Sequence, residues 1–169
     1  TGGTAASRGY LHYRFSDDLD FFVNDDKRFT LWADRFRQAL LTHADSQLSV
    51  QVNETRVVRL MLHYENIHLK IELINDVPSR VGTPLFHPQL GRLDTAENIL
   101  VNKISAAVDR NAPKDIADIW GFCTKLKLSL HDAITSAQSK AAGIFPADVA
   151  RVLCSVERSD WEVINWIER

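Results

Sequence analysis

The spacing of apolar residues differs between the two halves of the chain, and this difference constrains the fold more than any other feature. Between residues 18 and 76 apolar residues mostly follow strand patterns, whereas after residue 93 they recur three and four positions apart, as in helices. We therefore expect an α+β fold, with a mixed or antiparallel sheet lobe and flanking helices over 1–92 and an all-helical lobe over 93–169. The expected strands are 18–24, 48–53, 56–63 and 67–74, with one helix over 27–43.

Capping residues and prolines divide the second half into successive helices. The expected helix starts are Asp94 with Glu97, Pro113, Ser129, Pro146, and Ser159 with Glu162. The connection over 75–92 contains three prolines and two glycines with little apolar pattern. We expect it to lack regular structure.

Composition excludes several classes of protein. The 169 residues are 45% hydrophobic and 25% charged, which is typical of a globular chain and not of a disordered or collagen-like one. The net charge of -2 gives no overall basic field for nucleic acid. No apolar run reaches the roughly 18 residues of a membrane helix, and no signal peptide is visible. Cys123 and Cys154 are expected to be reduced thiols, so we expect a cytoplasmic protein with no membrane partner.

Two aspartates mark the first expected strand. Asp18 and Asp20 are two residues apart, so both carboxylates project from one face of the strand. Like charges held side by side repel each other, and a divalent cation that prefers oxygen ligands, such as Mg²⁺, removes the repulsion. The alternative is a solvated acidic turn at the start of a strand.

Glu72 adds a third carboxylate on a later strand, beside Lys70 on the same face. If the strands of Asp18 and Glu72 are neighbours in the sheet, three carboxylates meet on one surface, as in two-metal sites for phosphoryl chemistry. Alternatively, Lys70 and Glu72 form the polar side of a half-exposed strand.

A glycine turn, Gly2-Gly3-Thr4, precedes the acidic strand. Glycines let the backbone approach phosphate oxygens, and free N–H groups at the start of a helix favour anions. Arg14 and Ser16 fit a polar approach to the same site. A simple turn without a ligand is the alternative.

Together these motifs resemble the nucleotidyltransferase superfamily typified by DNA polymerase beta, and within it the AbiEii/AbiGii toxin family of type IV toxin–antitoxin and phage-defence systems. That bacterial family shows a Gly-Gly-Thr-Ala start, an Arg-x-Ser-x-Asp-Leu-Asp-Phe-Phe block, a Lys-x-carboxylate strand, and a helical signature of Lys, Arg, a basic-Asp pair and a second Asp. The matching positions are residues 2–5, residues 14–22, residues 70–72, and Lys103, Arg110, Lys114, Asp115 and Asp118.

The resemblance implies a Mg²⁺-dependent enzyme that moves NMP from an NTP onto an acceptor, with two Mg²⁺ ions expected. The implied catalytic and metal-binding residues are Asp18, Asp20 and Glu72. The implied nucleotide-binding residues are Gly2, Gly3, Thr4, Arg14, Ser16, Lys70 and Lys103. The second-lobe candidates are Arg110, Lys114, Asp115 and Asp118. The implied partners are an NTP, an acceptor that is either RNA, such as tRNA, or protein, and a cognate antitoxin.

Two departures from the family pattern leave other hypotheses open. Glu72 stands where an aspartate is more usual, and the chain begins on the glycine turn, so we expect a helix and a strand before Thr1. The alternative is a catalytically degenerate member that binds a nucleotide or a partner protein. A kinase or phosphate-binding regulator of the same fold is a third hypothesis.

The remaining polar and aromatic residues have structural interpretations. Asp115 and Asp118 share a helix face, either in a salt-bridge network or, as the resemblance suggests, facing an active cleft. Residues 103–140 contain six basic and four acidic side chains, a net charge of +2, which indicates either a modest RNA surface or a solvated face. The four tryptophans are expected in core or interlobe packing, and the histidines show no zinc-ligand spacing.

Overall fold

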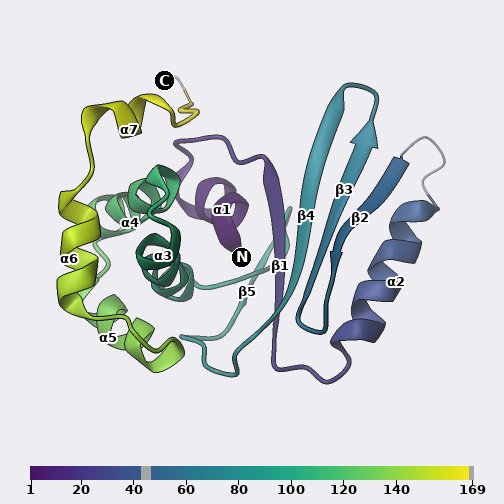
Figure 1. Ribbon diagram of the computed structural model, residues 1–169, viewed down its shortest axis with the longest axis horizontal. Coiled ribbons are helices and arrows are strands. Elements are labelled where there is room, and N and C mark those ends of the chain that lie inside the picture. Colours follow the sequence, from purple (N-terminus) through teal and green to yellow (C-terminus); the bar gives the residue numbers. More distant parts are fainter. Residues whose placement is uncertain (43–46, 168–169) are drawn as a thin grey trace. The chain divides into compact units, whose positions relative to one another are not determined.

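The computed structural model describes residues 1–42 and 47–167, and the chain forms two compact units. The helical unit contains Thr1–Ser16 and Ser79–Arg169, and the sheet unit is Asp17–Pro78 (Figure 1). The α+β class is confirmed. The two units are a different partition from the lobes expected at 1–92 and 93–169, because the first sixteen residues group with the helices. Among the described residues, no helix has the length and apolar character needed to cross a membrane.

The sheet unit is a mixed four-stranded sheet with one helix packed on it. The strands lie in the order β1 (Asp18–Asn24), β4 (Ile67–Asp76), β3 (Val57–Tyr64) and β2 (Gln47–Asn53), as Figure 1 shows. Strands β2, β3 and β4 form the expected antiparallel meander, and β1 pairs with β4 in parallel. One face forms a core with α2 (Phe29–Leu41). Its buried members are Phe29, Ala33, Val58, Leu60, Ile71 and Leu73.

The helical unit is built around α3 (Ala96–Arg110), which Figure 1 shows nearly end-on. Ile99 and Ile104 of this helix are fully buried. Helix α3 contacts α4 (Pro113–Lys125), α5 (Leu130–Lys140) and α6 (Pro146–Cys154). The short α7 (Arg158–Glu162) contacts α4.

The N-terminal segment belongs to this helical core. Helix α1 (Gly2–Thr4) continues into η1 (Ala5–Leu11), a π-helical segment, and both contact α3. The side chains of Ala6 and Leu11 are buried in the core. A Cβ on Gly121 would lie 2.8 Å from Leu11 Cδ1, so α4 approaches η1 closely only because this position is glycine.

Three of the expected helix starts are confirmed. Pro113 and Pro146 open α4 and α6, and the Ser129 hydroxyl accepts a hydrogen bond from the Asp132 N–H at the start of α5. The connection over 75–92 is more ordered than expected. It contains a short antiparallel pair, β5 (Leu85–His87) and β6 (Gly91–Leu93).

Two capping assignments are wrong. Thr95, not Asp94, caps α3, because its hydroxyl accepts from the Asn98 N–H. Glu157, not Ser159, caps α7 through a capping box with Asp160. Thr95 has the same capping chemistry as Asp94, so spacing alone did not identify the residue used, whereas Glu157 is not one of the residue types usually preferred as a cap.

Candidate functional site

The parallel pairing of β1 with β4 brings the expected acidic residues onto one face of the sheet unit. Asp18 lies opposite Lys70, and Asp20 lies opposite Glu72. Partners in register on a parallel pair project to the same side, and the alternate residues, such as Ile71, belong to the core with α2. Asp18, Asp20 and Glu72, called here the carboxylate cluster, therefore share the face that points away from that core.

Lys70 lies among the three carboxylates. Its Nζ atom is 2.8 Å from Asp18 Oδ2 and 3.7 Å from Glu72 Oε2. Partial burial opposes the charge of Lys70, but the hydrogen bond to Asp18 and the negative charges of Asp18, Glu72 and Asp20 raise its pKa above the ordinary value. The three carboxylates therefore already hold one positive charge, the ammonium of Lys70.

The donor chemistry of the cluster suits a hard divalent cation. Three carboxylates against the positive charges of Lys70 and Arg59 leave a formal charge of -1, and carboxylate oxygens are the ligands that Mg²⁺ prefers. Arg59 Nε donates to Glu72 Oε1 at 2.7 Å. Within the described residues no group of three His, Cys, Asp or Glu side chains is arranged to hold a metal ion. A divalent cation would fit this cluster only if it displaced the Lys70 ammonium.

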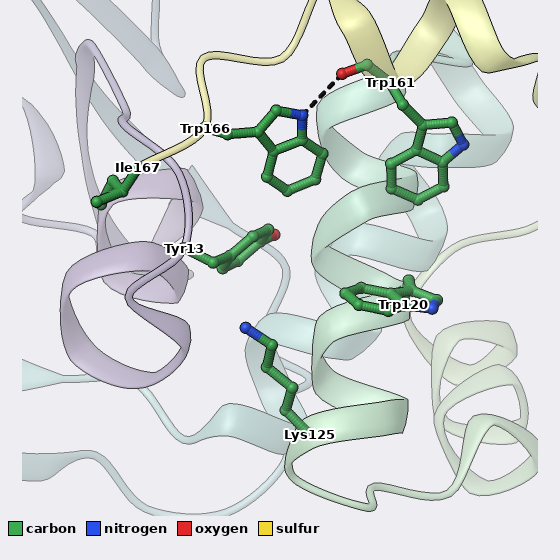
Figure 2. Close-up of a pocket in the computed structure, with 6 residues that line it drawn as sticks. All are labelled: Tyr13, Trp120, Lys125, Trp161, Trp166 and Ile167. Carbon is green, nitrogen blue, oxygen red and sulfur yellow. Dashed lines mark hydrogen bonds between the residues drawn. The ribbon is translucent and has the colours of Figure 1, made fainter. Parts of the chain in front are cut away.

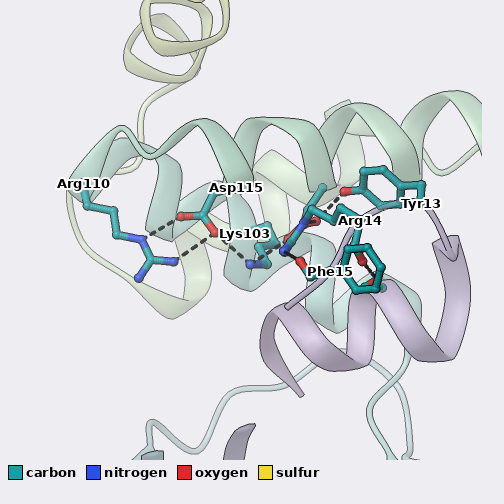
Figure 3. Close-up of polar contacts among 8 residues, drawn as sticks. Tyr13, Arg14, Phe15, Lys103, Arg110 and Asp115 are labelled. Carbon is teal, nitrogen blue, oxygen red and sulfur yellow. Dashed lines mark hydrogen bonds and ion pairs between the residues drawn. The ribbon is translucent and has the colours of Figure 1, made fainter. Parts of the chain in front are cut away.

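A second group of charges lies inside the helical unit and is called here the buried ion network: Arg14, Lys103, Arg110, Asp115 and Asp118 (Figure 3). Both aspartates are fully buried in α4. Arg14 donates from Nε and Nη2 to the two oxygens of Asp118, each at 2.8 Å. Lys103 of α3 lies 2.7 Å from Asp115 and 2.8 Å from Asp118.

Further hydrogen bonds complete the network. Arg110 donates from Nε and Nη2 to Asp115 at 2.7 and 3.0 Å, and the Tyr13 hydroxyl donates to Asp118. Burial alone would raise the pKa of both aspartates. The hydrogen bonds of Arg110 and the charge of Lys103 lower the pKa of Asp115, and the charge of Lys103 with the bonds from Arg14 lowers that of Asp118. Both carboxyls are therefore ionised at neutral pH.

The network settles what Asp115 and Asp118 contact. They join Arg14, from the segment after η1, to α3 and α4, which is the salt-bridge arrangement that the sequence left open. Lys114 is exposed on the same helix. Arg14 and Lys103 are only 3% and 6% exposed, so most of their surface is closed to a ligand.

The glycine turn is packed directly against this network. A Cβ on Gly3 would lie 2.9 Å from Arg14 Nη2 and 2.9 Å from Ser16 Oγ. Arg14 cannot move aside easily because Asp118 holds it at two points. Gly2 has a φ of +78°, in the left-handed region that glycine adopts without strain. The structure thus brings together Gly3, Arg14 and Ser16 from the expected nucleotide-binding set.

Two residues of these clusters were not identified from the sequence. Arg59 lies opposite Glu72 in the β3–β4 register, and the alternation of β3 was a signal that could have placed it on the polar face. Tyr13 had no such signal. Of the four tryptophans expected in core or interlobe packing, Trp32 and Trp120 are not core residues, since they are 40% and 47% exposed.

Comparison with solved structures identifies the class of fold. A protein from H. pylori described as a candidate nucleotidyltransferase aligns with a TM-score of 0.58 and 18% identity, over 95% of this chain and 75% of that one. The MenT4 nucleotidyltransferase toxin of Mycobacterium tuberculosis aligns with a TM-score of 0.43 and 17% identity, over 95% of this chain and 76% of that one. The fold is thus one shared with the H. pylori protein. No curated protein matches the chain.

The family follows from the sequence match. Residues 1–144 match the model of the AbiEii nucleotidyl transferase toxin of type IV toxin–antitoxin systems. The chain belongs to this family and is a nucleotidyltransferase-family enzyme, as the resemblance of its motifs predicted.

Proposed function

We propose that this toxin transfers a nucleoside monophosphate from an NTP to a hydroxyl group of RNA or protein, with a divalent cation such as Mg²⁺. The observation that carries the proposal is the carboxylate cluster, in which Asp18, Asp20 and Glu72 share one polar sheet face with an excess negative charge. Family membership supports the NTP substrate and a cognate antitoxin.

In this proposal the carboxylate cluster supplies oxygen ligands and a proton acceptor. Asp18 and Asp20 would hold one divalent cation, and Glu72 would help to hold a second one. The cation, when bound, polarises the phosphate and offsets charge that develops on its oxygens. Glu72 orients the acceptor hydroxyl and takes its proton. The hydroxyl oxygen forms a bond to the α phosphorus, the bond from that phosphorus to the bridging oxygen breaks, and pyrophosphate leaves.

Lys70 has a defined part in the same scheme. Its ammonium now neutralises Asp18 and Glu72, so it stands where a divalent cation would act. With a cation bound to these carboxylates, charge repulsion would favour release of the Lys70 ammonium, which could then contact the triphosphate. Lys70 is therefore proposed both to keep the cluster stable without a ligand and to bind the nucleotide.

The remaining nucleotide-binding residues divide into two roles. The amides of Gly2 and Gly3 and the hydroxyls of Thr4 and Ser16 are proposed to bind the β and γ phosphates. Arg14 and Lys103 are almost completely buried and their donors are used by aspartates, so we propose that they position the glycine turn. The second-lobe candidates Arg110, Lys114, Asp115 and Asp118 are proposed to help position the glycine turn. Alternatively, Arg110 and Lys114 contribute positive charge to the site.

Transfer of label from each α-³²P NTP tests this function. The protein is incubated with Mg²⁺ and a cell extract, beside Asp18→Asn/Asp20→Asn and the control Asp34→Asn, an exposed aspartate of α2. The wild type and the control should label a product with at least one NTP, and the double variant should not. Digestion of the product with ribonuclease or with protease then distinguishes RNA from protein as acceptor. Absence of transfer for every NTP would contradict the proposal.

A catalytically degenerate binding protein remains the second candidate function. The pairing of Lys70 with Asp18 and of Arg59 with Glu72 favours it, because internal cations already neutralise part of the cluster. Such a protein would bind an NTP without transferring label. Equilibrium dialysis with the same NTPs would then give binding that Asp18→Asn/Asp20→Asn does not change, because no cation acts at the cluster.

A further inference from the structure

The helical unit contains an aromatic pocket that the proposed transfer reaction does not use. Its described lining residues are Tyr13, Trp120, Lys125, Trp161, Trp166 and Ile167 (Figure 2). The pocket volume is about 570 Å³, within the usual range for small-molecule sites. Four of the six side chains are aromatic, and none of the six is acidic.

Several backbone contacts hold the pocket walls in place. The segment around Tyr13 pairs with the segment around Trp166, through hydrogen bonds from Phe15 N to Asn165 O at 2.8 Å and from Ile167 N to Tyr13 O at 2.9 Å. The Trp166 indole N–H donates to the Trp161 carbonyl at 2.8 Å, as Figure 2 shows. The pocket is therefore built from fixed elements, a property that favours ligand binding because little order is lost.

The aromatic rings form a stacked wall and one exposed platform. Trp161 and Trp166 stack with centroids 5.9 Å apart and planes at 15°, which leaves no space for a ligand between them. Trp120 meets Trp161 edge-on at 6.3 Å and is 47% exposed. An exposed tryptophan beside further aromatic rings leaves a patch of apolar surface in contact with water, which is unfavourable. Such patches commonly mark binding sites.

Charge determines which ligand fits. Aromatic cages also bind quaternary ammonium groups, but the Lys125 ammonium lies 5.2 Å from the Tyr13 ring centroid and would repel a cation. The same ammonium would attract an anion next to a planar group stacked on Trp120. A nucleobase carrying a phosphate has both features, and stacking on aromatic rings beside a basic residue is how unpaired bases are bound.

We propose that this pocket binds an unpaired nucleobase through Trp120, with its adjoining phosphate near Lys125. The base comes either from a free nucleotide or from a single-stranded nucleic acid. The pocket residues differ from those of the carboxylate cluster, and the proposal goes beyond the transfer function, since binding here requires neither a divalent cation nor a triphosphate.

The test measures binding with the transfer chemistry disabled. Fluorescence anisotropy of a labelled eight-nucleotide single-stranded RNA is recorded in EDTA with the Asp18→Asn/Asp20→Asn protein. We compare three further substitutions made in this protein: Trp120→Ala, Lys125→Ala and the control Trp32→Ala. Trp32 is an exposed tryptophan of α2. Unlabelled nucleoside monophosphates, inorganic phosphate and a blunt duplex of the same sequence serve as competitors, and circular dichroism verifies folding.

We expect Trp120→Ala to weaken binding by about fivefold to 100-fold, the effect of losing one stacked base. Lys125→Ala should weaken binding and reduce its dependence on salt, whereas Trp32→Ala should change neither. Competition by monophosphates, but not by inorganic phosphate or the duplex, would assign the site to a base. If monophosphates bind directly, as followed by NMR, and the RNA does not, the source is a free nucleotide. Equal affinities of the Trp120→Ala and Trp32→Ala proteins, or absence of both kinds of binding, would overturn the proposal.

Discussion

The two charged clusters of this protein use similar residues in opposite ways. The buried ion network contains two fully buried aspartates and three cations, of which only Arg110 is about half exposed, and several charge-assisted hydrogen bonds satisfy each carboxylate. The carboxylate cluster has three acids with two cations, and its side chains remain partly exposed, at 23% for Asp18 and 16% for Glu72. The aspartates of the network are closed to solvent, whereas the acids of the carboxylate cluster are partly open to it.

We propose that this difference separates a structural role from a functional one. Buried charges must be paired, because an isolated charge inside a protein costs several kcal/mol, so removal of one partner from the network is expected to destabilise the helical unit. Partly exposed like charges contribute little to stability and can even reduce it. We propose that the carboxylate cluster tolerates them because it binds a cation.

The largest effect is expected from opening the buried ion network. Asp118→Ala leaves the charges of Arg14 and Lys103 buried without their main partner and should lower the free energy of unfolding by about 3–5 kcal/mol. Urea denaturation followed by circular dichroism measures this. The control Asp109→Ala, at an exposed position of α3, should stay within about 0.5 kcal/mol of the wild type. A loss below about 1 kcal/mol for Asp118→Ala would remove the distinction between the clusters.

For the carboxylate cluster we expect a large loss of activity with little change in stability. Asp20→Asn should reduce nucleotidyl transfer at least 100-fold, about 2.7 kcal/mol of transition-state stabilisation, because one ligand oxygen loses its charge. Its free energy of unfolding should stay within about 0.5 kcal/mol of the wild type, since a like-charge repulsion is relieved. Transfer kinetics and urea denaturation of the same preparation check both statements. A destabilised but fully active variant would reverse the roles assigned to the two clusters.

A smaller effect is expected where the glycine turn meets the buried ion network. Gly3→Ala places a Cβ 2.9 Å from Arg14 Nη2, and Arg14 cannot withdraw without losing its bonds to Asp118. We expect a loss of about 1–3 kcal/mol in thermal or urea denaturation, as for other overpacked sites. Gly143→Ala is the comparison for a glycine in open space, where only the strain of its positive φ applies. A Gly3→Ala protein as stable as the wild type would show that Arg14 is not held rigidly.

The smallest effect is expected when the buried ion network is tested by lowering the pH. The pKa values of Asp115 and Asp118 are lowered on folding from the ordinary 3.8, so their contribution to stability is present above about pH 4 and is lost as the pH falls through the folded values. The free energy of unfolding should therefore decrease below pH 4, by up to about 1.4 kcal/mol per pH unit for each carboxyl. In Asp118→Asn that decrease should be shallower. An identical acid slope in both proteins would contradict the lowered pKa of Asp118.

The sequence predicted the strands and helices well because both patterns depend on local periodicity. The strand at 18–24 and the starts of α4, α5 and α6 agree with the structure. The short β5 and β6 pair was missed, since three-residue strands among prolines carry no period. The choice of Thr95 over Asp94 as cap depends on backbone geometry, which spacing does not contain.

The sequence could indicate which charged side chains share a strand or helix face, but not which contacts they make. Asp18, Asp20 and Glu72 were chosen from strand alternation, but their meeting required β1 to pair with β4, which only the tertiary fold decides. The partnership of Arg59 with Glu72 depends on register. Helix spacing places Asp115 and Asp118 on one face of the helix. It could not show whether that face lines a cleft or carries the salt bridges that the structure contains.

Binding of Mn²⁺, a spectroscopic substitute for Mg²⁺, tests the central claim most directly. Titration followed by electron paramagnetic resonance compares the wild type, Asp18→Asn/Asp20→Asn and the exposed control Asp34→Asn. If the carboxylate cluster is a cation site, the wild type and the control bind Mn²⁺ with equal affinity and the double variant binds at least about tenfold more weakly, a difference of about 1.4 kcal/mol. Equal Mn²⁺ binding by all three proteins would contradict the assignment.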